Sequence, residues 1–210
     1  PLFLQTKKLI EENILGNLYL VKLDWLMGSR SDPKREWNWY SLEEKGGGVI
    51  GALGTHAFDI LNWFFGEPTK VSGRLATSIK KRSLPRSSEL LEVTSEDICL
   101  ANLEIYNYGS KQLPCQVSLS SISRNGRGFC LEIYGSEGSL ILKSENQKDY
   151  VHGFNLKFSN KENIIQNITA DSIFNFDKTW SDGRIAPVKR IQDLWAESIL
   201  NKIPIVPGLC

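Results

Sequence analysis

The sequence predicts an α+β fold in which a large, predominantly antiparallel, open-faced sheet carries helices packed on one face. Three observations support this prediction. Much of the segment 69–143 alternates apolar and polar side chains with a period of two, as strands with one buried face do. Short turns that contain glycine separate these runs. Segments with helical spacing of apolar residues precede and follow them, so the helices gather outside the sheet.

Two elements are expected at the start of the chain. Residues 3–15 carry leucine and isoleucine near helical spacing, with lysine and glutamate between them, and Gly16 is suited to end this helix. Residues 18–26 are rich in leucine and aromatic side chains and lie between Gly16 and Gly28, which predicts a strand.

A polar loop of unusual content follows over residues 28–45. It contains two arginines and three aromatic residues, namely Arg30, Arg35, Trp37, Trp39 and Tyr40. Such side chains often cover a ligand or a partner. They also serve to hold a loop against the core, and both interpretations stand at this point.

The glycine triplet at residues 46–48 opens an apolar helix, which we expect over residues 49–65 and which Gly66 and Pro68 close. The triplet follows a loop rather than a strand, so we interpret it as a close-packing turn and not as a phosphate-binding nest. No G-x-G-x-x-G fingerprint of dinucleotide-binding domains follows a predicted strand, and no P-loop pattern is present.

The strands of the sheet are expected next, followed by one more helix. Extended or alternating runs cover residues 71–79, 98–106, 117–121, 129–133 and 140–142. The segment 83–95 contains serine, glutamate and proline and is expected to be a mobile loop, and residues 150–183 are expected to form weakly patterned strands and turns. Apolar spacing predicts a last helix over residues 188–202, ended by Pro204.

Composition restricts the class of protein. The chain has 210 residues and carries a net charge of +1. This near-neutral charge gives no electrostatic reason to expect nucleic acid or an anionic membrane as a partner. The basic run at residues 80–82 is interpreted as a solvated strand end. No apolar run approaches the ~20 residues that span a bilayer. The four cysteines lie far apart without metal-ligand spacing, so we expect no metal site and a reducing, cytoplasmic setting.

The helix at residues 49–65 holds the constellation with chemical content. Ala52, His56 and Asp59 are four and three residues apart, so a helix places them on one face. An imidazole beside a carboxylate suits proton transfer near neutral pH. The alternative is a core histidine whose ring is hydrogen-bonded to the backbone. The other histidine, His152, lacks such neighbours and is interpreted as an ordinary surface residue.

The stretch from the glycine triplet to Gly66 resembles the signature of the glucose–fructose oxidoreductase/inositol dehydrogenase (Gfo/Idh/MocA) family. The matching residues are Gly46, Gly47, Gly48, Gly54, His56, Asp59, Trp63 and Gly66. The segment 7–18, the segment 133–140 and the last helix also resemble that family, so the likeness runs across nearly the whole chain.

The resemblance implies that residues 1–210 form a single C-terminal substrate and oligomerisation domain, similar to those of dihydrodipicolinate reductase and glyceraldehyde-3-phosphate dehydrogenase. An N-terminal Rossmann domain that holds NAD or NADP would precede it and is absent from this chain, which begins at Pro1 without a methionine. His56 would be the catalytic acid and base, which accepts a hydroxyl proton from the substrate, and Asp59 would assist it. A homo-oligomer formed through the sheet face is also implied.

One departure from the family pattern concerns the substrate. Many family members have an aspartate four residues before the histidine, where this chain has Ala52. The family often places a tryptophan and a basic residue before the glycine triplet. Trp39 and Tyr40 occupy those places here, and with Arg35 nearby they are the best substrate-binding candidates.

Three functions therefore compete. The first is the substrate-side domain of an NAD(P)-dependent oxidoreductase that acts on a sugar, a polyol or a similar small hydroxylated molecule. The second is a catalytically degenerate family member that acts as an oligomeric interaction or scaffold protein, which Ala52 would suit. The third is a sugar-binding module that stacks sugars on Trp37, Trp39 and Tyr40.

Overall fold

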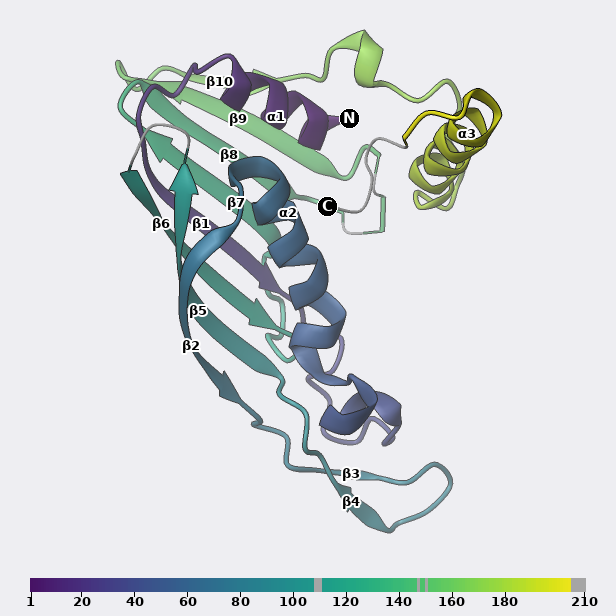
Figure 1. Ribbon diagram of the computed structural model, residues 1–210. Coiled ribbons are helices and arrows are strands. Elements are labelled where there is room, and N and C mark those ends of the chain that lie inside the picture. Colours follow the sequence, from purple (N-terminus) through teal and green to yellow (C-terminus); the bar gives the residue numbers. More distant parts are fainter. Residues whose placement is uncertain (108–110, 147, 150, 205–210) are drawn as a thin grey trace.

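The computed structural model describes residues 1–107, 111–146, 148–149 and 151–204. Its main element is an eight-stranded sheet with the strand order β10-β9-β8-β7-β1-β6-β5-β2 (Figure 1). The strands are β1 (Leu18–Leu26), β2 (Pro68–Ala76), β5 (Ile98–Asn107), β6 (Lys111–Ser120), β7 (Gly128–Gly135), β8 (Gly138–Ser144), β9 (Phe154–Asn160) and β10 (Ile165–Ile168). The central pair β1–β6 is parallel and the other neighbouring pairs are antiparallel. The predicted fold class is confirmed.

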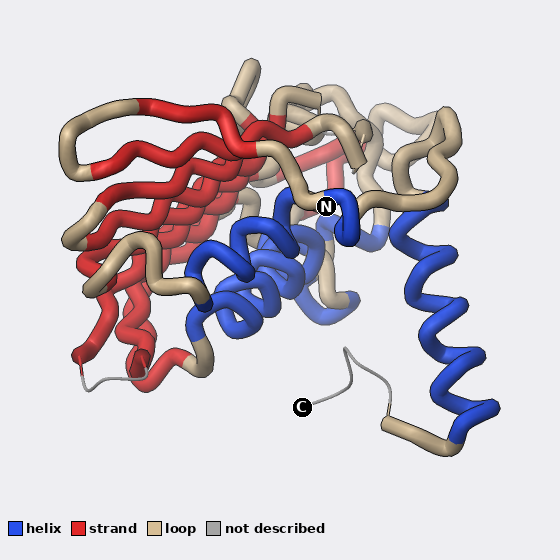
Figure 2. Tube along the Cα trace, turned by 90° about the horizontal axis from the view of Figure 1, so that it is seen from above, coloured by secondary structure: helices blue, strands red, loops and turns tan. Residues whose placement is uncertain are grey.

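Two helices, α1 (Leu2–Glu11) and α2 (Thr55–Phe65), cover one face of this sheet (Figures 1 and 2). The strand residues that point toward them form the core. Leu23 in β1 and Leu131 in β7 are fully buried, and Phe3 of α1 packs on Phe129 with ring centroids 5.4 Å apart. Because β1 lies in the middle of the sheet, its C-terminal end comes to lie against α2.

The last helix, α3 (Ile185–Asn201), stands apart from the sheet (Figure 1). Its predicted position is confirmed, but its apolar stripe is uncovered: Ile199 and Leu200 are 77% and 80% exposed, whereas Ala186 is buried. Within the described residues, no helix is both long and apolar enough to cross a membrane.

Some of the predicted boundaries were wrong. The first helix ends at Glu11 rather than at residue 15, because Asn13 and Gly16 adopt positive φ angles of 56° and 65°. The strand expected to reach residue 79 ends at Ala76. Beyond it, the carboxylate of Asp97 accepts the backbone N–H groups of the next residues, so that they cannot continue the ladder.

The segment 83–95 is not simply a mobile loop. It contributes to a small hairpin of β3 (Lys81–Ser83) and β4 (Leu90–Glu92), which lies beyond the end of β2 (Figure 1). Arg82 in β3 is only 3% exposed, so the interpretation of residues 80–82 as a solvated strand end was wrong for this residue. The hairpin forms because it packs against the loop at residues 28–45, a contact that no local pattern reveals.

The helix expected over residues 49–65 is present, but its first turn is wider than that of an α-helix. Residues Ile50–Gly54 form a π-turn, in which the N–H of Thr55 donates to the carbonyl oxygen of Ile50. The regular helix α2 starts only at Thr55. The one-face spacing of Ala52 and His56 that a plain α-helix would give is therefore altered.

Three cysteines, Cys99, Cys115 and Cys130, have buried free thiols. Burial raises the pKa of Cys115 to about 12. This thiol is therefore protonated near neutral pH and behaves as a core residue rather than as a nucleophile. Cys210 lies outside the described residues.

Candidate functional site

The glycine triplet allows the chain to turn tightly into the helix. A Cβ atom at Gly47 would collide with the backbone carbonyl oxygens of Tyr40 and Leu42. Gly48 has a φ of +94°, a conformation that side chains with a Cβ rarely adopt. These contacts support the interpretation of the triplet as a close-packing turn.

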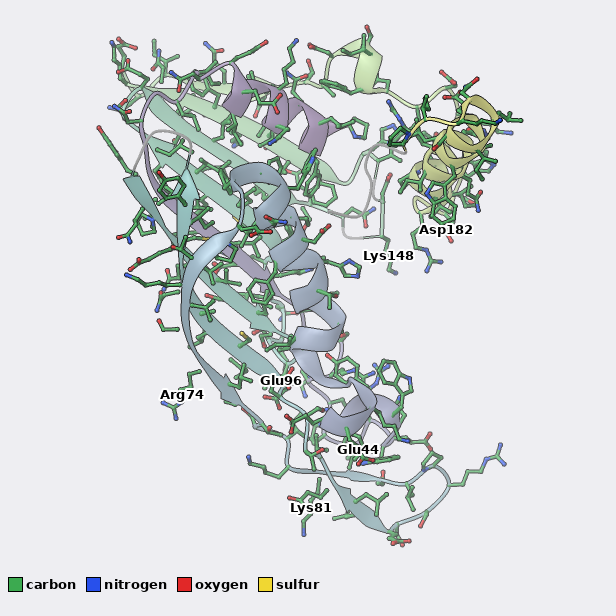
Figure 3. The ribbon with its side chains drawn as sticks, in the orientation of Figure 1. Glu44, Arg74, Lys81, Glu96, Lys148 and Asp182 are labelled. Atoms are coloured by element: carbon green, nitrogen blue, oxygen red, sulfur yellow. The ribbon has the colours of Figure 1, made fainter. Side chains whose placement is uncertain are left out.

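Glu96 caps the N-terminal end of this helix. Its Oε1 accepts a hydrogen bond from the backbone N–H of Ile50 at 2.7 Å, and its carbonyl oxygen accepts one from Val49 at 2.9 Å. Figure 3 shows Glu96 beside the N-terminal end of α2, which follows the π-turn directly. A carboxylate stabilises a helix N-terminus, and here it takes the amide that a phosphate would use. The residues at this turn therefore do not fit the pyrophosphate of a dinucleotide.

Replacing Glu96 by alanine is expected to destabilise the fold by about 1–2 kcal/mol, because the Ile50 amide loses its acceptor. Glu96→Gln keeps an oxygen at the same place without the charge, so a smaller loss is expected. Urea unfolding of both variants measures these losses. A Glu96→Ala variant as stable as the wild type would contradict the capping role.

His56 projects from the first turn of α2 and its side chain is exposed. Its ring lies beside the indole of Trp25, with ring centroids 6.4 Å apart. The described residues offer its imidazole no hydrogen-bond partner, and its exposure excludes the alternative of a buried core histidine. Trp25 packs edge-on against Phe129, and its Nε1 is enclosed without an acceptor. The sequence analysis did not single out Trp25, because a tryptophan in a strand is an ordinary core residue.

Asp59 lies one turn beyond His56 on α2. Its side chain lines a groove of about 640 Å³ between α2 and the edge strand β2, whose other lining residues are mostly apolar, such as Phe58, Val71 and Leu103. No hydrogen bond or ion pair joins Asp59 to His56, which both lie in the described part of the chain. Ala52 is half-buried in the π-turn. The structure thus does not bring the three residues together as one contact group.

The loop at residues 28–45 is held in two ways. Trp37 fastens it to the hairpin, since its backbone N–H donates to Ser83 at 2.7 Å and its Nε1 donates to the carbonyl oxygen of Glu92 at 3.0 Å. Trp39, by contrast, is 60% exposed and contacts only the edge of Tyr40 among the described rings. Of the two interpretations of these aromatics, Trp37 fits the structural one and Trp39 remains available to a ligand.

Tyr40 and Arg30 form a stacked pair in this loop. The guanidinium carbon of Arg30 lies 3.4 Å from the centroid of the Tyr40 ring. Burial raises the pKa of Tyr40, and the neighbouring Arg30 offsets part of that effect. Burial also lowers the pKa of Arg30, because it disfavours the charged form.

Arg82 is a site residue that sequence reasoning missed. Its guanidinium reaches from β3 into the loop and donates to the carbonyl oxygens of Arg30 and Asp32 at 2.7 and 2.8 Å. Arg35, a predicted substrate residue, is exposed and donates through Nη1 to the carbonyl oxygen of Ser29 at 2.7 Å. Three guanidinium groups are therefore held at this loop: those of Arg35 and Arg82 by backbone carbonyl oxygens, and that of Arg30 by the Tyr40 ring.

Comparisons with known proteins agree with this architecture. The chain is 43% identical, over all of its 210 residues, to an uncharacterized oxidoreductase of Synechocystis sp., of which it covers 56%. The chain thus spans about half the length of that relative. A levoglucosan dehydrogenase solved in complex with NADH and L-sorbose superposes with a TM-score of 0.77 at 19% identity, over 96% of this chain and 55% of that one.

A protein with a different role shares the same fold. The transcriptional regulator Gal80p from Kluyveromyces lactis superposes with a TM-score of 0.70 at 16% identity, over 94% of this chain and 49% of that one. The family model described as "Oxidoreductase family, C-terminal alpha/beta domain" matches residues 7–209. The chain therefore belongs to the Gfo/Idh/MocA oxidoreductase family and corresponds to the C-terminal domain of its members.

Proposed function

We propose that this chain is the substrate-side domain of an NAD(P)-dependent oxidoreductase that acts on a sugar, a polyol or a similar small hydroxylated molecule. The observation that carries the proposal is the imidazole of His56, which is exposed on α2 and unpaired among the described residues. A family relative of known name, levoglucosan dehydrogenase, binds NADH and L-sorbose in its solved complex. A cytoplasmic setting, expected from the cysteines, belongs to the same proposal.

The nicotinamide cofactor would be held mainly by a part of the protein outside this chain. The described residues do not supply a pyrophosphate cradle, because Glu96 occupies the helix start and the glycine triplet is filled by close backbone packing. The cofactor's chemistry is to accept or deliver the hydride. This domain would contribute the proton transfer and part of the substrate pocket.

His56 would move the proton. A neutral imidazole nitrogen accepts the proton of a substrate hydroxyl during oxidation and returns it during reduction. Trp25 lies beside the ring, with the two ring centroids 6.4 Å apart, and would limit the positions open to the imidazole. Asp59 would assist only indirectly, through the helix that both residues share.

The substrate would lie between His56 and the loop at residues 28–45. Trp39 offers an exposed aromatic face for stacking and Tyr40 a half-buried phenol, while Arg35 offers an exposed charge. Ala52 places a methyl group where many family members have a carboxylate, so this chain would bind the substrate without a negative charge at that point.

Under this proposal, the proton-transfer group lies in this chain and the cofactor-binding residues lie mainly in the rest of the protein. Residues 1–210 alone are expected to show no NAD(P)-dependent turnover of sugars, polyols or their oxidised forms, whereas the full-length protein turns over at least one of them. Turnover by the isolated chain would refute the division of the site.

A second candidate function is supported by the Gal80p comparison. Gal80p is a transcriptional regulator with this fold, so the fold also occurs in a protein with a regulatory role. An interaction or scaffold protein would need neither a carboxylate at position 52 nor a working His56. The two candidates differ in one respect that can be measured: only the oxidoreductase requires nicotinamide binding coupled to turnover.

Both candidates would suit an oligomer formed through the open face of the sheet. Leu100 and Tyr106 of β5 point to this face and are 50% and 60% exposed. We expect a sedimentation mass of at least about twice the 23.7 kDa of the chain, and we expect Leu100→Glu to lower it. A wild-type chain that sediments as a monomer at tens of micromolar would count against the sheet-face oligomer.

A further inference from the structure

Three arginine side chains gather at the C-terminal end of β1 without a carboxylate partner. They are Arg30, Arg35 and Arg82, which we call the arginine cluster. None of the three forms an ion pair with a described residue, although Arg82 is buried and Arg30 is half-buried. Unpaired guanidinium groups in such surroundings are costly, which raises the question of what compensates their charge.

The carboxylates of Asp97 and Asp32 act on Arg82 through their charge, but neither forms an ion pair with it. Asp97 accepts the backbone N–H groups of Ser78 and Ile79 at 2.9 Å each, and Asp32 accepts that of Lys34 at 2.9 Å. Arg82 is satisfied by backbone carbonyl oxygens of the loop, which do not neutralise its charge. With three guanidinium groups against these two carboxylates, the cluster keeps a net positive charge.

Arg30 adds a second sign of an incomplete site. Its guanidinium stacks on Tyr40, and its Nη1 is enclosed without any hydrogen-bond acceptor among the described residues. Such orphaned donors are rare in folded proteins and call for an explanation. An anion bound at the mouth of the cluster would offset this charge.

Arg35 is the member that a ligand can reach. It is exposed, and only its Nη1 is bonded within the described structure, to Ser29. The remaining N–H groups of its planar fork are free to bind the two oxygens of a carboxylate or a phosphate. Arg30 and Arg82 would strengthen this contact through their charge.

The cluster lies at the same end of β1 as His56. Trp25, which packs beside His56, is five residues before Arg30, so their Cα atoms are at most about 17 Å apart. The strand β1 ends alongside β6, and the N–H of Arg30 donates to the carbonyl oxygen of Ser121 just after β6, which fixes the loop at this edge. An arginine side chain and an extended sugar together bridge such a span.

We propose that the substrate carries an anionic group and that the arginine cluster binds it, with Arg35 making the direct contact. The inference rests on the proposed function, because it assigns a substrate class to the same site. A sugar acid or a sugar phosphate has this chemistry. Ala52 agrees with it, since an aspartate at that position would repel an anionic substrate.

The test is a direct binding titration of the full-length protein without cofactor, followed by NMR. Gluconate and glucitol are a matched pair, because they differ only in a carboxylate replaced by an alcohol, and glucose 6-phosphate provides the phosphate arm. We expect gluconate or glucose 6-phosphate to bind roughly tenfold to a hundredfold more tightly than glucitol. Whichever of the two binds more tightly identifies the anion.

Two variants connect this preference to the cluster. Arg35→Gln is expected to weaken binding of the anionic ligand at least tenfold more than binding of glucitol, which removes the preference, and Arg35→Lys to restore part of it. Arg74→Gln is the matched control, since Arg74 is an exposed arginine on the edge strand β2 (Figure 3). Circular dichroism checks that each variant folds.

Two results would overturn the proposal: equal dissociation constants for the anionic and neutral ligands, or a preference that survives Arg35→Gln. Because binding is measured without turnover, the outcome is separate from that of the proposed function. A protein that binds gluconate through Arg35 but oxidises nothing would refute the oxidoreductase and leave the anion site standing.

Discussion

Replacing His56 by alanine in the full-length protein is expected to lower kcat by about a hundredfold to ten-thousandfold, the range that general acid–base groups contribute. The imidazole is exposed on α2 and unpaired among the described residues, and under the proposed function its removal takes away the group of this domain that accepts the hydroxyl proton. KM is expected to change little, because the proton transfer develops in the transition state rather than in the bound ground state. Steady-state kinetics of both proteins measure this.

His152 provides the control for this prediction. It is also an exposed histidine, and its Nδ1 lies 3.6 Å from the carboxylate of Asp149 in a turn remote in sequence from α2. His152→Ala is expected to retain the wild-type rate. A His56→Ala variant that keeps more than half of the wild-type kcat would remove His56 from the reaction.

Leu131→Ala is expected to destabilise the domain by about 2–5 kcal/mol, the range for deleting a fully buried leucine. Leu131 is 0% exposed in the centre of the sheet, between Leu23 of β1 and Leu142 of β8, which are also fully buried. The neighbouring strands are fixed by their hydrogen bonds on both sides, so they cannot close the cavity. Urea denaturation measures the loss as a lower midpoint with an unchanged slope.

The matched control for this substitution is Leu100→Ala. Leu100 belongs to the same sheet but points to the open face and is 50% exposed. Its truncation is expected to cost less than about 1 kcal/mol in a monomeric sample. Equal losses for the two substitutions would mean that the helix-covered face is not the core.

Local patterns predicted the regular elements well. The strand expected over residues 18–26 has those bounds in the structure, because glycines flank a run of apolar and aromatic residues. The strands β5, β7 and β8 and the last helix also lie where alternation and helical spacing placed them, whereas β6 begins at Lys111, six residues before the run expected at 117–121. These elements depend mainly on short-range chemistry, which a sequence displays directly.

Features that depend on contacts between distant segments could not be predicted in this way. The β3–β4 hairpin is held by Trp37, which is far from it in sequence. Arg82 was taken for a solvated residue because charge alone says nothing about burial, and Glu96 carries no signal that it caps a helix 46 residues before it.

The candidate site was predicted in part. His56 is exposed as a proton acceptor must be, whereas Asp59, one turn further along α2, lines the groove beside β2 and forms no hydrogen bond or ion pair with His56 among the described residues. Arg35, Trp39 and Tyr40 do share one loop, as expected from their proximity in sequence. The buried arginines that support this loop became visible only in three dimensions.

The central claim is that this domain works in a nicotinamide-dependent oxidoreductase. It is tested most directly by a turnover screen of the full-length protein with NAD(H) and NADP(H) against neutral sugars, polyols, sugar acids and sugar phosphates. The account predicts that at least one substrate changes the nicotinamide absorbance and that His56→Ala abolishes most of that change. No turnover together with no nicotinamide binding would contradict it and would favour an interaction protein built on the same fold.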